Sequence, residues 1–431
     1  MLPRTEDKNS GTRRRRILML THRVPCPPDR GDRIRGYYLL RQLSKSFDVD
    51  LACTSSTPVA PEHRATFRES ARRLLITPIC TRGSVLTGSA ALVRGHAITP
   101  SWHYRSALAR TIRQWHRHEP YDAVLTISTG MARYARCLAS PAGAAQRSHR
   151  PRLVLDLVDV DSLKWRRYAQ RSAAPMRWVY GLEARRLRRV EADQAWDAVT
   201  VISDAEAADY RLHVGNAPRL EVVGNGVDLD TFAALPDPRT STLVFTGVLN
   251  YRPNVEGICW FVAHVMPLLR RLPQVDVRLM IVGRDPCAAV RDLDAEPAVE
   301  VVGPVADVRN ALRESSIAIA PLQIARGVQN KVLEAMASAR AVVASPAAAQ
   351  GIDAVPGRHL LVADLPHEWA GHIERLLRDA HQRRVLGLSA RQLVEDQYTW
   401  TQRSRPMVDL LHNLIDESRR APSASARREA A

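Results

Sequence analysis

The sequence predicts an α/β protein built from two successive Rossmann-like domains, each with a doubly wound parallel sheet. Three observations favour this fold class. The 431 residues are enough for two hydrophobic cores. Short β-rich runs alternate with amphipathic stretches from Arg15 onward. A Gly-, Asp- and Pro-rich stretch without periodicity, residues 223–241, separates one such series from the next.

The first series contains six short runs that are typical of buried strands. They cover residues 15–20, 48–54, 73–79, 121–128, 152–159 and 197–203. The clearest helix is expected at residues 31–46, because Gly36, Leu39, Leu40 and Leu43 recur at helical spacing on one face.

The second series has the same architecture but shares no motif with the first. Its expected strands cover residues 241–249, 277–283, 299–303, 317–322, 341–345 and 359–363. The longest helix between them is expected at about residues 255–272. Together the two series predict an N-terminal domain, an inter-domain region, a C-terminal domain, a C-terminal helix, and a disordered tail. These parts are residues 14–222, 223–241, 242–395, 396–418 and 419–431.

Composition narrows the class of protein. The formal net charge of +17, mostly from arginine, favours anionic partners such as nucleic acid, acidic lipid or phosphorylated small molecules, although a general arginine and alanine bias gives the same composition. No apolar run is long enough to span a bilayer, and the start of the chain lacks the apolar region of a signal peptide. Six cysteines stand singly, without CxxC pairs. We therefore expect a cytoplasmic protein with no metal site.

Two loops are candidate ligand sites, because ligands of open parallel sheets bind beyond the carboxyl ends of strands. The first loop, residues 21–36, places Gly31 at the start of a helix, where it allows a ligand to approach backbone amides. Asp29 and Arg33 flank it. The alternative is an ordinary helix start with solvated charges.

The second loop leads into a helix expected to begin near Gly327. Asn330 and Glu334 are then i, i+4 neighbours and Lys331 lies near both, while Val332, Leu333, Ala335 and Met336 pack inward. A lysine and helix-start amides can hold a diphosphate, and a carboxylate can accept hydrogen bonds from ribose hydroxyls. Alone this pattern is weak evidence, because a Lys and Glu at this spacing more often form a solvated surface pair.

Several motifs occur in the same order as in a known family. They are the loop ending at Gly31, "SDAEAADY" (203–210), "VVGNGVDLDTF" (222–232), "FTGVLNYRPNVEG" (245–257), "MIVGRDP" (280–286) and "NKVLEAMASARAVVAS" (330–345). Over roughly residues 15–415 the chain resembles the GT-B glycosyltransferases of family four. The resemblance implies two Rossmann-like domains facing across a cleft, a nucleotide-diphosphate sugar as co-substrate, transfer with retention, and no metal or other cofactor. It also implies that residues 14–222 form the acceptor domain, that residues 242–395 form the donor domain, and that the helix expected at 396–418 packs back on the first domain.

Other stretches are similar to a narrower group, the bacterial sugar transferases associated with exopolysaccharide and protein-sorting gene clusters. They are "PCPPDRGDRIRGYYLLRQLS", "DLVDVDSLKW", "GVLNYRPNVEGICWF" and "ARGVQNKVLEAMA". This resemblance implies exopolysaccharide or cell-surface glycan synthesis, with a glycan or lipid-linked acceptor at the inner face of the cell membrane.

The chain also departs from the family. The first of the family's two glutamates is replaced by Arg326, whereas the second is Glu334. The family's arginine and lysine after the first C-domain glycine are Val248 and Pro253 here. We therefore assign the catalytic cations to Arg252, Arg326 and Lys331. The donor-binding candidates are Gly31, Gly247, Asn254, Gly327, Asn330, Lys331 and Glu334.

Acidic residues follow the strand expected at 152–159. For Asp159 and Asp161 we expect an acceptor-side or inter-domain role, with helix capping by Asp161 or Ser162 as the alternative. The acceptor-binding candidates are Asp29, Arg33, Asp159 and Asp161.

Two other functions remain open. A nucleotide-sugar epimerase of the same fold would bind the same donor without an acceptor. A basic nucleic-acid-binding protein is the less favoured reading, because aromatic residues are 5% of the chain and are not interleaved with its basic runs. Contact with an anionic membrane suits the basic charge better, and residues 82–118, which contain Trp102, Tyr104 and Trp115, have a suitable composition.

Overall fold

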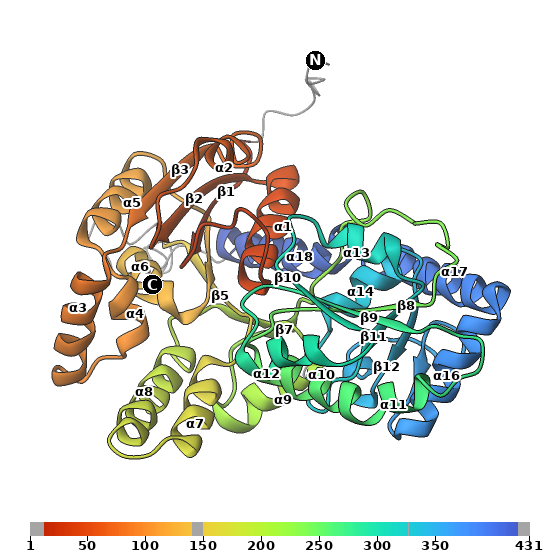
Figure 1. Ribbon diagram of the computed structural model, residues 1–431. Coiled ribbons are helices and arrows are strands. Elements are labelled where there is room, and N and C mark those ends of the chain that lie inside the picture. The colour runs from red at the N-terminus through yellow and green to blue at the C-terminus, as the bar shows by residue number, and fades with distance from the viewer. Residues whose placement is uncertain (1–12, 140–149, 326, 421–431) are drawn as a thin grey trace, which may run out of the picture. The chain divides into compact units, whose positions relative to one another are not determined.

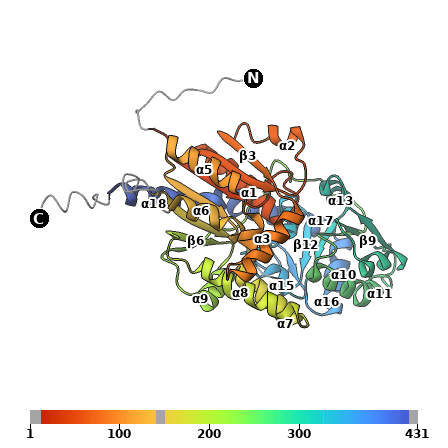
Figure 2. The same cartoon turned by 90° about the vertical axis from the view of Figure 1, so that its left-hand side faces the viewer.

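The computed structural model describes residues 13–139, 150–325 and 327–420. The chain divides into two compact units. Unit 1 comprises Met1–Val201, Asp209–Glu221 and Pro406–Ala431, and unit 2 comprises Ile202–Ala208 and Val222–Arg405. Each unit contains one β-sheet with helices on both of its faces (Figures 1 and 2). The predicted fold class, two Rossmann-like units, is confirmed. The expected tail lies outside the described residues from position 421 onward.

The first sheet has seven strands in the order β3-β2-β1-β4-β5-β6-β7, and the pairs among β1 to β6 are parallel. The strands are β1 Arg16–Thr21, β2 Asp48–Ser55, β3 Arg73–Pro78, β4 Ala123–Ile127, β5 Arg152–Leu157, β6 Ala198–Val201 and β7 Leu220–Val222.

The helices that accompany this sheet connect its strands in chain order. They are α1 Gly31–Ser46, α2 Pro61–Ala65, α3 Thr81–Val93, α4 Ile98–His103, α5 Ser106–His118, the 3₁₀ turn η1 Thr129–Met131, α6 Ala132–Ala139, α7 Asp161–Arg171 and α8 Met176–Glu191. Two further helices, α9 Asp204–His213 and α18 Trp400–Arg420, contain residues of both units.

The second sheet has six strands in the order β10-β9-β8-β11-β12-β13, and all five pairs are parallel. The strands are β8 Thr242–Thr246, β9 Arg278–Val282, β10 Val299–Gly303, β11 Ile317–Ala320, β12 Ala341–Ala344 and β13 Leu361–Val362. The helices are α10 Arg252–His264, α11 Met266–Leu269, α12 Ala288–Arg291, the 3₁₀ turn η3 Asp292–Ala295, α13 Val308–Glu314, α14 Asn330–Ala337, α15 Pro346–Ala349, α16 Pro366–Arg378 and α17 Ala380–Gln397.

All twelve predicted strands are present, and most are shorter than expected, although β2 extends one residue further and β10 has the predicted bounds. Two other features differ from the sequence-based expectation. The single helix expected at 255–272 is wrong, because α10 ends before Val265 and Pro267 occupies the start of α11. Proline has no N–H to continue the helical ladder. Strand β7 was not predicted, since three residues at a sheet edge give no periodic signal.

A buried ion pair lies beneath the centre of the first sheet. On α1, Gly36 and the three predicted leucines are buried, as expected, but so is Arg35. Arg35 donates from Nε and Nη2 to the two carboxylate oxygens of Asp156 on β5, both at 2.6 Å. Thr200 on β6 donates to the same carboxylate at 2.6 Å. Both charged side chains are fully buried, so the pair stabilises the packing of α1 on the sheet. Removal of either partner would leave a buried charge without compensation.

Candidate functional site

Both sheets have a topological switch point, the place where strand order reverses. In unit 1 the first strand, β1, lies between β2 and β4, and in unit 2 the first strand, β8, lies between β9 and β11. The loops after β1 and β4, and those after β8 and β11, therefore diverge at the carboxyl ends of their sheets. This divergence forms the crevice in which open α/β sheets bind ligands.

At the switch point of unit 2, one hydrogen bond joins the two diverging segments. Lys331 Nζ, on α14, donates to Asn254 Oδ1, on α10, at 2.6 Å. Asn254 Nδ2 donates in turn to the carbonyl of Val248 in the loop after β8, at 2.8 Å. The ammonium also lies 4.2 Å from the centre of the Phe245 ring. Two donor-site candidates that are 77 residues apart in the sequence are thus held together.

Gly247, directly after β8, leaves the space in front of this pair open. A Cβ atom at position 247 would lie 2.8 Å from Asn254 Nδ2 and 2.9 Å from Lys331 Nζ. Any side chain here would therefore displace the lysine or fill the space in front of it. Gly327 has a different role, since its φ of +59° is in the left-handed region that favours glycine.

Helix α14 begins at Asn330, three residues later than expected. Its N-cap, Gln329, makes no side-chain capping bond, and its side chain donates instead to the Gly327 carbonyl at 3.3 Å. Among the described residues, the buried Oδ1 of Asn330 has no hydrogen-bond partner. The start of this helix therefore has polar groups available for a ligand.

The inner face of α14 agrees with the prediction. Its four predicted core residues are buried: Val332, Leu333, Ala335 and Met336. Lys331 and Glu334 are half-buried, and within the described part of the chain the Glu334 carboxylate makes no hydrogen bond or ion pair.

Burial changes the acidity of both charged groups on α14. It lowers the pKa of the Lys331 ammonium to about 7, although the nearby Glu334 carboxylate opposes this shift. Burial likewise raises the pKa of the Glu334 carboxyl to about 7, opposed by Lys331. Neither charge is fully compensated by the protein, so an anion near Lys331 and hydroxyl donors near Glu334 would stabilise both charged forms.

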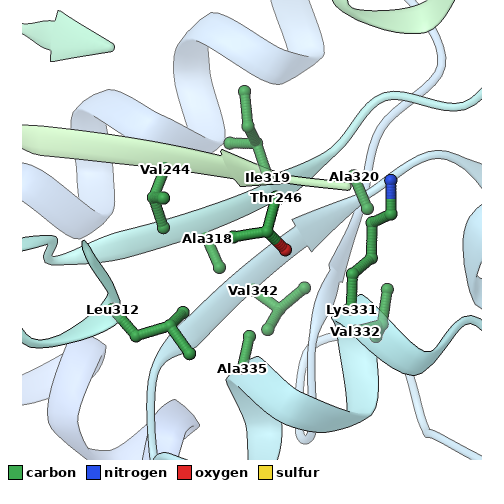
Figure 3. Close-up of a pocket in the computed structure, with 10 residues that line it drawn as sticks. All are labelled: Val244, Thr246, Leu312, Ala318, Ile319, Ala320, Lys331, Val332, Ala335 and Val342. Carbon is green, nitrogen blue, oxygen red and sulfur yellow. The ribbon is translucent and has the colours of Figure 1, made fainter. Parts of the chain in front are cut away.

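A small cavity lies beneath α14 (Figure 3). Its volume is about 10 Å³, and most of its lining is aliphatic, including Val244, Leu312 and Ala335. Figure 3 shows the Lys331 side chain extending past Ala320 at the cavity edge. The cavity has room for no more than about one water molecule. The cavity is therefore too small for an organic ligand, and the open space of this site lies in front of Lys331 Nζ, beside Gly247.

Other donor and catalytic candidates are placed differently. Arg252 begins α10 and is largely exposed, and its Nε donates to Glu256 Oε1 at 2.5 Å. Arg326 lies outside the described residues. Gly31 begins α1 in unit 1, and a Cβ there would meet no atom within 4 Å, so no close backbone approach requires glycine at this position. The structure thus brings Gly247, Asn254 and Lys331 together, with Asn330 and Glu334 on the same helix.

The switch point of unit 1 carries an ionic cluster around Asp32 on α1. Its carboxylate lies 2.6 Å from Arg23 Nη1, 3.2 Å from His22 Nε2 and 3.2 Å from Arg30 Nε. Burial opposes ionisation of Asp32, but its hydrogen bond and charge interaction with His22, together with Arg23, hold the pKa of the carboxyl well below its usual range. The basic side chains of the loop after β1 therefore compensate the negative charge of Asp32.

His103, from α4, completes this unit 1 site and was not assigned from the sequence. Its ring packs edge-on against His22 with centroids 5.5 Å apart, and its Nδ1 lies 3.3 Å from Thr54 Oγ1. Burial, together with electrostatic interactions with His22 and Arg23, lowers the pKa of His103 to about 3. No spacing pattern in the sequence links a histidine on α4 to the loop after β1. The sequence signal nearest to this site is the turn "STG" (128–130), which follows β4.

The acceptor-binding candidates have partners within unit 1. Arg33 Nη1 lies 3.0 Å from Asp29 Oδ1, and Lys164 Nζ lies 3.5 Å from Asp159 Oδ2. Asp161 accepts from the hydroxyl of Thr129 at 2.5 Å, which joins the start of α7 to η1. The N-cap of α7 is Val160, so neither Asp161 nor Ser162 occupies the N-cap position.

The described residues contain no group of three or more His, Cys, Asp or Glu side chains placed to hold a metal ion. Within the same residues, no helix combines the length and apolar character needed to cross a bilayer.

The fold is that of the GT-B class, to which solved structures match over almost the whole chain. A sucrose-phosphate synthase from Thermosynechococcus elongatus is 17% identical, with a TM-score of 0.66, and the match covers 94% of this chain and 100% of that one. Anabaena HepE in complex with UDP is 14% identical, with a TM-score of 0.60 and coverage of 93% and 100%. WaaG, a glycosyltransferase involved in lipopolysaccharide biosynthesis, is 14% identical, with a TM-score of 0.60 and coverage of 92% and 99%.

A more specific likeness concerns unit 2 alone. Residues 240–379 match the family model described as glycosyl transferases group 1. This segment contains Gly247, Asn254, Lys331 and Glu334. A search of curated protein sequences gives no match to the chain.

Proposed function

We propose that the chain transfers a sugar from a nucleoside diphosphate donor, bound at the switch point of unit 2, to a glycan or lipid-linked acceptor. The observation that carries this proposal is the Lys331–Asn254 hydrogen bond across the switch point, with Gly247 open in front of it. The glycosyl transferases group 1 match supports sugar transfer, and the UDP complex of HepE supports a nucleoside diphosphate as ligand.

Each group has a distinct part in this proposal. Lys331 contacts the diphosphate and stabilises the charge that develops on it as the sugar leaves. Asn330 and the first amides of α14 donate to the same phosphates. Glu334, one turn further along, accepts hydrogen bonds from the ribose hydroxyls. Arg252, if it leaves Glu256, adds a second cation.

The finer features rest on the family resemblance. We propose transfer with retention, without a metal or other cofactor, in the synthesis of exopolysaccharide or another cell-surface glycan. Asp29, Arg33, Asp159 and Asp161 remain candidates for the acceptor side, and the site of action proposed is the inner face of the cell membrane.

Calorimetric titration with UDP and with uridine tests the donor site. Lys331→Ala is expected to weaken UDP binding at least tenfold and uridine binding little, because it removes a charge-assisted contact to phosphate. Glu334→Gln is expected to weaken both ligands about tenfold, because neutral hydrogen bonds replace charged ones.

Lys45→Ala on α1 and Glu300→Gln on β10 are matched controls, since both side chains are exposed. Unchanged UDP affinity in both site variants would remove the donor-site assignment. Sugar transfer is then tested with UDP-glucose and a panel of acceptors. An epimerase would convert the nucleotide sugar with no acceptor present, whereas a transferase requires one.

A further inference from the structure

Helix α3 of unit 1 has an unusual distribution of apolar residues between its buried and exposed positions. Its buried face consists of small residues, Ser84, Gly88 and Ala91, which allow close packing on α4. Its solvent face carries larger apolar side chains, with Leu86 72% and Val93 88% exposed. A soluble helix normally buries its larger apolar residues. An external apolar partner would explain why the larger apolar side chains of α3 are exposed and its small residues are buried.

The hairpin of α7 and α8 continues the exposed apolar surface. Trp178, near the tip of this hairpin, is 77% exposed, and Leu182 follows it one turn later on the same face of α8. Hydrophobic groups of this size rarely face water together in a protein without a partner. Open space of about 800 Å³ is lined by Leu92 of α3 together with Trp178 and Leu182.

The two elements are fixed to one another within unit 1. Arg186 of α8 donates to the carbonyls of Leu92 and His96, at 3.0 and 2.8 Å. Glu183 of α8 accepts from the backbone amides of Ile98 and Thr99, at 2.6 and 2.8 Å. Figures 1 and 2 both show α3 and the α7–α8 hairpin on the same side of the first sheet. They therefore form one continuous surface.

The charge of this surface is strongly positive, although the exposed Asp159 pairs with Lys164 at the start of α7. Between residues 161 and 191 the basic residues are Lys164, Arg166, Arg167, Arg171, Arg177, Arg185, Arg186, Arg188 and Arg189. The acidic residues there are all withdrawn from the surface: Glu183 and Glu191 are buried and Asp161 is half-buried. The sequence from 70 to 118, which includes α3, contains no Asp or Glu. An anionic partner is therefore complementary to the whole surface.

We propose that the exposed faces of α3 and the α7–α8 hairpin form a membrane-docking surface that binds anionic bilayers. Leu86, Val93, Trp178 and Leu182 enter the interface, and the surrounding arginines contact lipid phosphates. A bilayer fits better than nucleic acid, because the aliphatic face of α3 offers nothing to a sugar-phosphate backbone. The proposal is independent of the sugar-transfer reaction.

The surface differs from the one suggested by the sequence. The aromatic residues of segment 82–118 are engaged within unit 1: Tyr104 stacks on Tyr134 with centroids 5.3 Å apart, and Arg73 lies 4.7 Å from the Trp115 ring centre. Trp102 is half-buried. Of that segment, only the α3 portion contributes to the proposed surface.

Co-sedimentation of the full chain with vesicles tests the proposal. We expect binding to phosphatidylcholine vesicles that contain phosphatidylglycerol, and weak binding to pure phosphatidylcholine. Arg177→Ala combined with Arg185→Ala is expected to weaken binding about thirtyfold. Trp178→Ala is expected to weaken it about tenfold.

Two control variants separate this surface from general basic charge. Arg110→Ala combined with Arg113→Ala removes the same charge from exposed positions on α5, and Leu388→Ala removes an exposed leucine from α17 in unit 2. Both are expected to bind vesicles as the unmodified chain does.

Three outcomes would overturn the proposal. They are no preference for anionic vesicles, equal losses in the α5 and α8 double variants, and self-association or RNA binding that Trp178→Ala abolishes while vesicle binding is unaffected. UDP affinity, measured on the same variants, reports separately on the donor site. A chain that binds UDP but not vesicles would retain the proposed donor site and lose the docking surface.

Discussion

The two switch points have the same topology but treat their charges differently. In unit 1, Asp32 has three basic neighbours, and Asp29 pairs with Arg33. In unit 2, Lys331 donates its hydrogen bond to an amide oxygen, and the Glu334 carboxylate interacts with the Lys331 charge but makes no hydrogen bond among the described residues. Paired charges stabilise a loop, whereas half-buried charges that lack partners favour a ligand that can compensate them. The comparison therefore favours unit 2 as the location of the ionic ligand that we propose.

The largest effect is expected where charges are fully buried. Asp156→Asn removes the carboxylate that Arg35 requires, and breaking such a pair costs about 3–5 kcal/mol in the free energy of unfolding. Asp159→Asn, which removes an exposed partner of Lys164, is the control and should cost about 0–1 kcal/mol. Urea denaturation measures both. Equal values for the two variants would contradict the view that buried charges in unit 1 are structural.

A substitution that fills the space in front of Lys331 tests the unit 2 part of this comparison. Gly247→Ala places a Cβ against Nζ, so UDP affinity should fall roughly tenfold to a hundredfold, equivalent to one lost charge-assisted contact. Gly303→Ala is the control, because its φ is also positive but no atom lies within 4 Å of its Cβ. Calorimetric titration compares the two, and an equal loss in both would attribute the effect to backbone strain.

The pH dependence of UDP binding should have a maximum near pH 7. Phosphate favours the protonated form of Lys331, so affinity falls as pH rises above its pKa of about 7. Glu334 must be ionised to accept hydroxyl hydrogen bonds, so affinity also falls as pH drops below its pKa of about 7. The decline should approach tenfold per pH unit on each side. Lys331→Ala should abolish the alkaline decline and Glu334→Gln the acid one; a flat profile for the unmodified chain would refute this assignment.

The smallest effect concerns stability at the ligand site. Lys331→Met keeps the length of the side chain and removes a partly desolvated charge, which offsets the lost hydrogen bond to Asn254 and contact with Phe245. The free energy of unfolding should therefore change by no more than about 1 kcal/mol in urea denaturation. A loss comparable to that of Asp156→Asn would make Lys331 a structural residue.

The sequence alone determined the fold class and the buried face of helix α14. Alternating buried strands and amphipathic helices leave few arrangements other than a doubly wound sheet, because parallel strands require crossover helices on both faces. The pattern of Val332, Leu333, Ala335 and Met336 likewise specifies which face of α14 is buried, since helical periodicity is a local property.

Only the tertiary structure decided which polar residues meet. Lys331 reaches Asn254, and His103 reaches His22, because strand order brings distant loops to one sheet edge, and no local pattern records strand order. The same holds for charge: Arg35 and Arg252 look alike in the sequence, yet one is fully buried against Asp156 and the other is largely exposed beside Glu256. Burial is set by the packing of segments far apart in the chain, and it determines whether an arginine stabilises the fold or remains accessible to a ligand.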